Sequence, residues 1–375
     1  MLTTKEKISK NIINFLGWKS KQKLLIIESD DWGTIRMPSI EVYHELIKNN
    51  IPVDKFSFDK HDSLESTEDL ESLYKTLTTV QDSKGNPAVL TAYHVMANPN
   101  FEAIEKNGRT KYGYETILET YKRNLHTQDS FAAIQKGMEL GIYIPQFHGR
   151  EHIHVKRWME AINSNSSKEQ LAFQNQAIIW TGSEHDKNPY KKDYFKGFDY
   201  ETNQEAKEVE SIHQDGLRLF KEIFGMESVT FTAQGSVWGD HLLPMLNKGG
   251  VRLIGGQQLH PDCQGAYKTI NKYWGTKNTL DQIYWRRNCL FEPARNQNFD
   301  WVGKCLREIE IAFRWGKPAV ISSHRENFIG SVFEENRIQS LQKLEQLLKK
   351  VLKKWPDVQF ISSAQLAEIM IKSTR

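Results

Sequence analysis

Seven short apolar runs, each followed by turn or polar residues, constrain the fold of this 375-residue chain more than any other feature. They span residues 24–29, 88–94, 142–148, 229–234, 251–256, 319–324 and 358–363. Such runs are typical of strands that are covered on both faces. Between many of them lie helix-like segments that end at Gly or Pro, as at 116–141, 215–225 and 336–356. This alternation predicts a parallel sheet, and its number of repeats favours closure into a barrel over an open sheet.

The composition is that of an ordinary globular protein with a large core, since 39% of the residues are hydrophobic and 26% are charged. Lys and Arg number 50 against 47 Asp and Glu, and the basic residues are spread along the chain, which gives nucleic-acid binding little support. We expect neither a secretory signal nor a transmembrane segment, because no suitable apolar stretch occurs. Cys263, Cys289 and Cys305 are too few and too scattered for a disulfide framework, so we expect a cytoplasmic location.

One region, from Lys156 to about Asp215, is polar and interrupts the alternation. Structureless loops of this length are uncommon in compact domains, so we expect a partly helical insertion over one end of the barrel. We therefore predict one domain over residues 1–375, with an insertion at about 156–215. The aromatic residues of the insertion either stack on a sugar ring or form a small satellite core: Trp180, Tyr190, Tyr194, Phe195, Phe198 and Tyr200.

Acids and imidazoles directly follow the predicted strands, where the ligand site of a parallel α/β architecture lies. The residues to inspect there are Asp30, Asp31, His94, His148, Gln234 and His324. In FHGREHIH, His152 follows His148 by four residues, and a helix there would place both imidazoles on one face. Two histidines and one carboxylate form the three-ligand site that zinc chemistry uses. One of the adjacent aspartates could bind the metal while the other remains a free base, and His154 is the main rival ligand.

The motifs SDDWG (29–33) and HGREH (148–152), followed by a late strand that ends at His324, occur in the order of a known family. The set resembles the polysaccharide deacetylase, or NodB-homology, family of metal-dependent carbohydrate esterases. The resemblance implies a distorted (β/α)7-type barrel of the glycoside hydrolase and deacetylase kind, which removes acyl groups from amino sugars with zinc or a similar divalent ion. Carried over by position, it implies a metal held by Asp31, His148 and His152. It further implies that Asp30 is the catalytic base and His324 the catalytic acid.

The sequence departs from the family pattern at two motifs. Trp32 stands between the Asp pair and Gly33, so the turn geometry is expected to differ. Gln234 occupies the place where the family has an arginine, which leaves the substrate class more open than the reaction. The residues that we expect to contact the substrate are Trp32, His94, Asn98, Gln234 and Arg325.

The segment RRNCLFEP (286–293) offers the two charges that would tune a catalytic base and acid. Arg287 would be a cation beside Asp30, and Glu292 an anion that orients His324. A solvated strand would carry the same residues, so both readings stay open. The two roles could instead belong to Arg325 and Glu326.

The leading hypothesis is a hydrolase with one divalent metal ion, Zn²⁺ or another transition metal, that removes an acyl group from a carbohydrate or glycan precursor. The acyl group would be acetyl, bound to nitrogen or oxygen, and the substrate a carbohydrate or glycolipid. One alternative is a catalytically silent sugar-binding barrel, which would not need both a base and an acid. Another is a metal-dependent hydrolase of a non-carbohydrate amide or a phosphoester, for which a second metal is typical.

Overall fold

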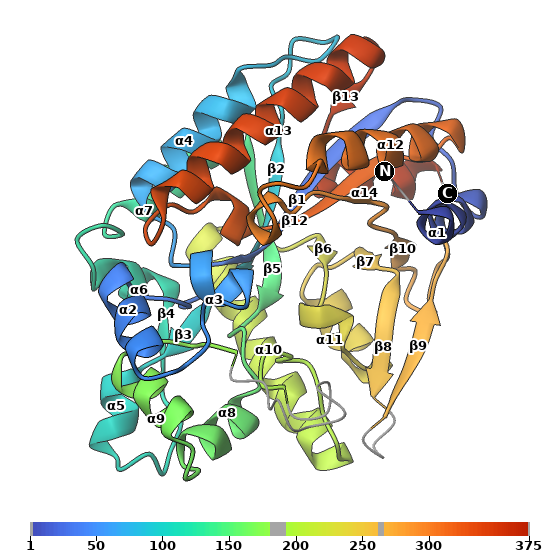
Figure 1. Ribbon diagram of the computed structural model, residues 1–375. Helices are drawn as coiled ribbons and strands as arrows, with labels where there is room; N and C mark the ends of the chain where they lie inside the picture. The colour runs from blue at the N-terminus through green and yellow to red at the C-terminus, as the bar shows by residue number, and fades with distance from the viewer. Residues whose placement is uncertain (1–2, 181–192, 262–265, 374–375) are drawn as a thin grey trace.

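A curved sheet of parallel strands forms the centre of the protein (Figure 1). The computed structural model describes residues 3–180, 193–261 and 266–373. The strands follow the order β10, β7, β6, β5, β2, β1, β12 and β11, and β13 pairs with the first residues of β1. Their bounds are β1 (Leu24–Trp32), β2 (Leu90–Val95), β5 (Tyr143–Gly149), β6 (Thr230–Phe231), β7 (Leu253–Gly255), β10 (Ile283–Trp285), β11 (Cys289–Leu290), β12 (Ala319–His324) and β13 (Gln359–Phe360).

Each of the seven predicted runs contains a strand of this sheet, and every pairing within the sheet is parallel. The predicted α/β barrel class is therefore confirmed. The sequence did not reveal β10 and β11, which are only three and two residues long. Within the described ranges no pairing joins these two edge strands, so the sheet curls into a distorted barrel that remains open between them.

The apolar runs are continuous because both faces of the sheet are buried. In β1, Leu25 and Ile27 belong to the large cluster beneath the outer helices, whereas Leu24 and Ile26 belong to a second cluster inside the curl. None of these four side chains is more than 2% exposed. Burial on both faces explains why the alternating pattern of a half-exposed strand is missing.

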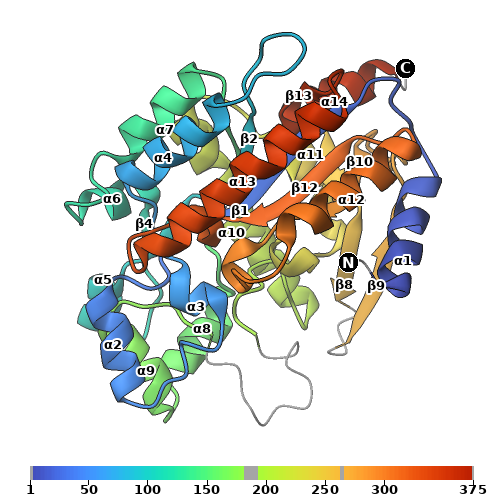
Figure 2. The same ribbon diagram turned by 45° about the horizontal axis from the view of Figure 1, so that its top comes forward.

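Helices cover the outer face of the sheet, as both ribbon views show (Figures 1 and 2). The covering helices are α4 (Thr67–Thr78), α6 (Ile117–Lys122), α7 (Ser130–Glu139), α10 (Asn203–Phe224), α11 (Leu243–Lys248), α12 (Trp301–Arg314) and α13 (Glu334–Lys354). Two further helices flank them, α1 (Thr4–Phe15) beside α12 and α14 (Ser363–Ser373) beside β6 and β10. The predicted helix at 116–141 is two helices, because Thr127 and Asn124 form local hydrogen bonds in the turn between α6 and α7.

Several excursions lie beyond the carboxyl ends of the central strands, in the lower half of Figure 1. They contain α2 (Ile40–Lys48), α3 (Ser57–His61), β3 (Ala97–Pro99), α5 (Phe101–Lys106), β4 (Tyr114–Thr116), α8 (Val155–Ile162), α9 (Ser167–Gln174), β8 (Gln257–Pro261) and β9 (Tyr267–Asn271). Short 3₁₀ turns complete the chain at η1 (Gln234–Ser236), η2 (Asp240–Leu242), η3 (Pro293–Arg295) and η4 (Arg325–Phe328). Only α8 and α9 belong to the predicted insertion, because α10 packs against β5 as a barrel helix.

The aromatic residues of the insertion are mostly structural. Tyr194, Phe198 and Tyr200 are at most 7% exposed, and Tyr194 packs with Trp158 and Phe173 in a separate small cluster. This favours the satellite core for Tyr194, whereas Phe198 belongs to the large core cluster of the barrel and Tyr200 packs edge-on against His241. Tyr190 and Cys263 lie outside the described residues, while the other two cysteines are buried free thiols. Among the described residues, no helix combines the length and the apolar character that spanning a bilayer requires.

Candidate active site

The adjacent aspartates lie at the carboxyl end of β1, where the strand is distorted. The register between β1 and β2 shifts between Ser29 and Trp32, and Asp31 has a φ of 76°. A left-handed φ costs about 1–2 kcal/mol for most residues, although aspartate visits it more readily than most. Successive side chains of a regular strand point to opposite faces. The bulge therefore lets Asp30 and Asp31 serve the same site.

Three of the predicted residues come together as a candidate metal centre. Asp31 Oδ1 lies 2.9 Å from His152 Nε2 and 3.4 Å from His148 Nε2. One ligand atom from each of the three residues lies within 4.8 Å of the other two. This donor set of two imidazoles and one carboxylate matches a three-ligand divalent site. In the described part of the chain it is the one cluster of three or more such side chains that could hold an ion.

The helix that we expected to connect the two histidines is not formed. Residues 150–153 are bends, and α8 begins only at Val155. The reason is local: Gly149 has a φ of 127°, and the Gln234 amide donates to the carbonyl oxygens of His148 and Glu151. The prediction that a helix places His148 and His152 on one face was therefore wrong. The imidazoles are nevertheless neighbours, with ring centroids 5.4 Å apart.

Hydrogen bonding orients one of the imidazoles toward Asp31. His148 Nδ1 lies 2.9 Å from the carbonyl oxygen of Thr232, which can only accept, so this nitrogen carries the proton. Nε2 of His148 then presents a lone pair toward Asp31. Burial opposes ionisation of Asp31, but His152, the foremost of the opposing groups, helps to hold the pKa of Asp31 well below its usual value. His154, the rival ligand, instead caps α8 by accepting from the Arg157 amide.

Asp30 is paired with a half-buried arginine. Arg287 donates to both carboxylate oxygens of Asp30 at 2.6 Å, and its Nε donates to Glu28 at 2.6 Å. Burial would raise the pKa of Asp30, but Arg287 outweighs this effect, and the net shift is downward. The bidentate pair fixes the orientation of the carboxylate as well as its charge.

His324 lies across from Asp30, because the register of β1 and β12 makes the two residues direct neighbours. Its Nε2 is 3.9 Å from Asp30 Oδ2, and its Nδ1 is 2.6 Å from Glu292 Oε1. Burial disfavours the charged imidazole, but Glu292 and the two aspartates outweigh it and raise the pKa of His324 to about 10. Glu292 is itself held by a 2.7 Å hydrogen bond from Asn327. These contacts, rather than any with Arg325 or Glu326, surround the two predicted catalytic groups.

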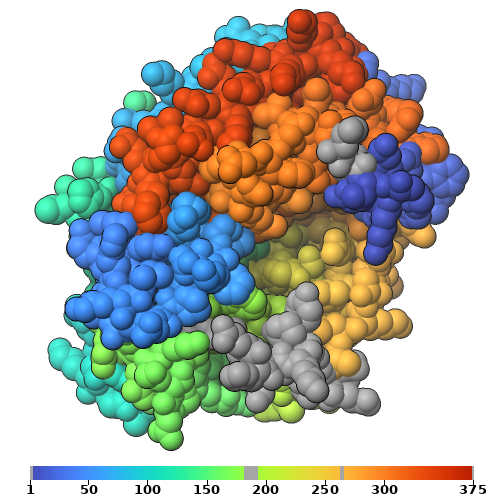
Figure 3. All heavy atoms as spheres, viewed as in Figure 1, coloured from blue at the N-terminus to red at the C-terminus, as the bar shows by residue number. Residues whose placement is uncertain are grey.

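The assembled site is reachable from solvent. The side chains of His324, Arg287 and His152 are 22%, 19% and 13% exposed. The space-filling view shows a hollow on this face, bordered by the blue segment that contains α3 and by an orange segment of the chain (Figure 3). Phe58, on α3, places its ring edge-on to His324 with centroids 5.1 Å apart.

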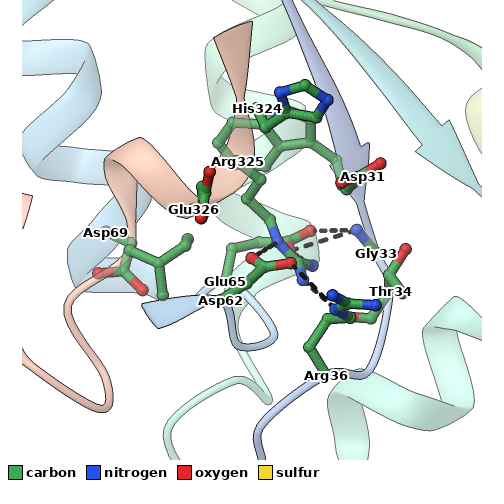
Figure 4. Close-up of polar contacts among 12 residues, drawn as sticks. Asp31, Gly33, Thr34, Arg36, Asp62, Glu65, Asp69, His324, Arg325 and Glu326 are labelled. Atoms are coloured by element: carbon green, nitrogen blue, oxygen red, sulfur yellow. Dashed lines mark hydrogen bonds and ion pairs between the residues drawn. The ribbon is translucent and has the colours of Figure 1, made fainter. Parts of the chain in front are cut away.

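Arg325 was expected to contact the substrate, but its side chain is fully buried beneath the site. Its guanidinium donates to Asp62 at 2.9 Å, to Glu65 at 2.7 Å and to the Thr34 carbonyl at 2.8 Å. Glu65 in turn accepts from the Gly33 amide at 3.0 Å. Figure 4 shows Arg325 pointing between these groups. Arg325 therefore anchors the turn that follows the two aspartates.

The other four residues that we expected to contact the substrate are buried as well, and none is more than 1% exposed: Trp32, His94, Asn98 and Gln234. Trp32 donates to Ser29 and stacks on Phe328. Asn98 donates to the Gly33 carbonyl and accepts from the Ile35 amide. His94 bonds to the Tyr143 hydroxyl at 2.6 Å, and Gln234 braces the loop described above. Trp32, Asn98 and Gln234 thus hold the turns around the site, whereas Nδ1 of His94 is buried without a hydrogen-bond partner among the described residues.

Glu28 was not predicted as a site residue, although it stands out as a carboxylate within the apolar run LLIIES. Glu28 is fully buried, and besides Arg287 it accepts from Ser363 at 2.5 Å and Trp285 at 3.1 Å. Glu326 is buried too, and neither of its carboxylate oxygens has a hydrogen-bond partner among the described residues. Burial, aided by the nearby Glu292 carboxylate, raises the pKa of Glu326 to about 8.

No protein-family model and no curated protein sequence matches the chain. Several solved structures match it. One is a provisionally assigned glycoside hydrolase/deacetylase from Parabacteroides distasonis, which is 10% identical. The match has a TM-score of 0.49 and covers 94% of this chain and 72% of that one. A provisionally assigned polysaccharide deacetylase from Mycobacterium smegmatis is 10% identical, with a TM-score of 0.44 over 96% and 93%. A peptidoglycan deacetylase from Bacillus subtilis is 8% identical, with a TM-score of 0.37 over 94% and 93%. At these identities and scores the likenesses carry no argument about the reaction.

Proposed function

We propose that this protein is a metal-dependent hydrolase that removes an acyl group, acetyl being the expected one, from a nitrogen or oxygen atom of a carbohydrate. The observation that carries the proposal is that the two adjacent aspartates have different partners. Asp31 faces two imidazoles, while Asp30 is held by Arg287 and lies across from His324. One site thus combines a divalent ligand set, a candidate base and a candidate acid.

The residues present fit a divalent ion. Asp31, His148 and His152 would hold it, since one carboxylate and two imidazole nitrogens already converge and His148 is fixed in the tautomer that ligation requires. When bound, such an ion acidifies a water molecule and stabilises negative charge on the acyl oxygen. The remaining chemistry falls to the charged groups around the ion.

Asp30 suits the role of general base. Its ion pair with Arg287 keeps it ionised and prevents it from turning toward Asp31. In the proposed reaction a water oxygen forms a bond to the acyl carbon, and Asp30 accepts the proton that this water loses. Arg287 is a positioning residue, because it holds the base without contacting the reacting atoms.

His324 suits the role of general acid. Nδ1 is committed to Glu292, so Nε2 is the atom that donates a proton to the departing nitrogen or oxygen as the bond from that atom to the acyl carbon breaks. An amine needs this proton in order to leave. The surrounding carboxylates keep the pKa of His324 high, so the protonated form is available at neutral pH. A bound cation would offset part of this effect.

A sugar-binding barrel would not require a base and an acid on either side of a metal site. A two-metal phosphoesterase would need further ligands, and the described residues form one candidate cluster. The proposed reaction is tested with chelator-treated protein, which is reloaded with Zn²⁺, Co²⁺ or Mn²⁺ and assayed for acetate release from chito-oligosaccharides and O-acetylated glycans. Metal-dependent acetate release supports the proposal. Absence of release from the whole panel by fully loaded protein would contradict it.

A further inference from the structure

The N-terminal helix α1 presents its apolar face to solvent. Ile8, Ile12, Phe15 and Leu16 are 56%, 61%, 55% and 43% exposed. Positions 8, 12 and 15 fall on one side of a helix, so these side chains form a continuous stripe. Figures 1 and 2 show α1 at the edge of the molecule, on the outside of α12. Large apolar side chains that gather in this way usually mark an interaction site.

The opposite, polar face of α1 attaches the helix to the protein. Asn14 is fully buried and accepts a 2.8 Å hydrogen bond from Asn288. Lys10 lies 3.2 Å from the buried Glu308, and Asn11 accepts from the Trp315 indole at 2.8 Å. A surface helix ordinarily turns its apolar stripe to the core and its polar side to water. In α1 this arrangement is inverted. Phe15 touches Trp315 edge-on with ring centroids 5.1 Å apart, and the exposed Ile8 and Ile12 are available for a partner.

Positive charge surrounds the stripe. Residues 3–23 contain six lysines and one glutamate, which corrects the expectation that the basic residues are evenly spread. Lys10 and Lys23 are paired with Glu308 and Asp357, and the single glutamate, Glu6, belongs to the capping box of α1. Four lysines remain exposed: Lys5, Lys7, Lys19 and Lys21. A partner that fits this surface must therefore present both apolar groups and negative charge.

We propose that α1 docks the protein on the surface of an anionic lipid bilayer. An exposed apolar stripe with lysines around it is the pattern of a helix that lies in the membrane interface, where acyl chains receive the apolar side chains and headgroups the ammonium groups. A second copy of the chain fits less well, because the two sets of lysines would face each other. The inference goes beyond the proposed reaction and does not depend on it.

Hydrogen bonds at both ends stabilise α1 in its helical form. Thr3 and Glu6 form a capping box at its first turn. At its other end Lys317 donates to the carbonyl oxygens of Leu16, Gly17 and Trp18 at 2.9, 2.8 and 2.5 Å. Both ends are thus satisfied before any partner binds, which lowers the ordering cost of association.

The test is cosedimentation of the full chain with phosphatidylcholine vesicles, prepared with or without phosphatidylglycerol. The protein should bind the anionic vesicles, and added salt should weaken the binding. The double variant Ile8→Gln and Ile12→Gln should lower the partition coefficient at least about tenfold. The matched control is Leu125→Gln with Leu140→Gln, which changes side chains that are 83% and 57% exposed elsewhere and should bind like the wild type.

A second variant tests the charge. Lys5→Gln with Lys7→Gln should weaken binding to anionic vesicles about fivefold per lysine. The inference is overturned if the wild type does not sediment with anionic vesicles, or if the Ile8/Ile12 variant binds them equally well. Light scattering that shows a dimer converted to a monomer by that variant would also overturn it, in favour of a second copy. Asp30→Asn should bind like the wild type, so docking and hydrolysis can fail separately.

Discussion

Replacing Glu292 with glutamine should shift the alkaline limb of the pH–rate profile to lower pH. His324 must be protonated to act as the acid, so activity falls as the pH rises through its pKa. Burial opposes the charged imidazole, and Glu292, at 2.6 Å from Nδ1, is foremost among the groups that outweigh it and raise the pKa of His324 to about 10. Glutamine keeps the shape of the side chain but removes its charge.

The size of this shift follows from the strength of the contact. A hydrogen bond between charged groups contributes about 1.5–3 kcal/mol. One pH unit corresponds to about 1.36 kcal/mol, so the limb should move down by about one to two pH units. A bound metal ion would lower the absolute pKa of His324 in wild type and variant alike, and the difference would remain.

The assay is kcat for acetate release, measured as a function of pH at saturating substrate and metal. Glu292→Asp, which keeps the charge, is the matched control and should retain a limb closer to that of the wild type. A merely structural role for Glu292 would lower kcat equally at all pH values. An alkaline limb that stays in place in Glu292→Gln would refute this assignment of the acid.

Three further predictions concern the same end of the barrel. Asp30→Asn should lower kcat at least about a hundredfold while metal content stays at the wild-type level, and near-normal turnover would exclude Asp30 as the base. Arg287→Met leaves Asp30 and Glu28 buried without their cation, so the free energy of unfolding in urea should fall by about 3–5 kcal/mol, and a loss well below this would show that the pair is solvated. Gly33→Ala should lower the free energy of unfolding by about 1–3 kcal/mol, because Gly33 has a φ of 81° and an added Cβ would lie 3.1 Å from the Val95 carbonyl oxygen. An unchanged urea midpoint would contradict this reasoning.

The barrel could be predicted because its signals are local. Strands buried on both faces read as apolar runs, and the carboxyl ends of parallel strands meet at one edge, which brings Asp30 beside His324. The short edge strands β10 and β11 escaped because RRN, at 286–288, separates them and the apolar stretch around each is only three residues long. Incomplete closure of the barrel could not be foreseen for the same reason.

The site was predictable in its grouping but not in its details. Motif order suggested the five central residues, yet the turn between His148 and His152 depends on a Gln234 amide that lies more than eighty residues away in the chain. Strand ends also carry residues that point inward. Arg325 follows β12 as a substrate-contacting residue would, but its partner Asp62 is 263 residues distant, and their pairing follows only from the tertiary fold.

Metal stoichiometry tests the central claim most directly, namely that Asp31, His148 and His152 share one ion. Wild-type protein that has been stripped with chelator, incubated with Zn²⁺ and desalted should retain one ion per chain by elemental analysis. Asp31→Ala, His148→Ala and His152→Ala should each retain much less, whereas the rival position, as His154→Asn, should retain the wild-type amount. A wild-type protein that keeps no ion, or three variants that keep it in full, would contradict the account.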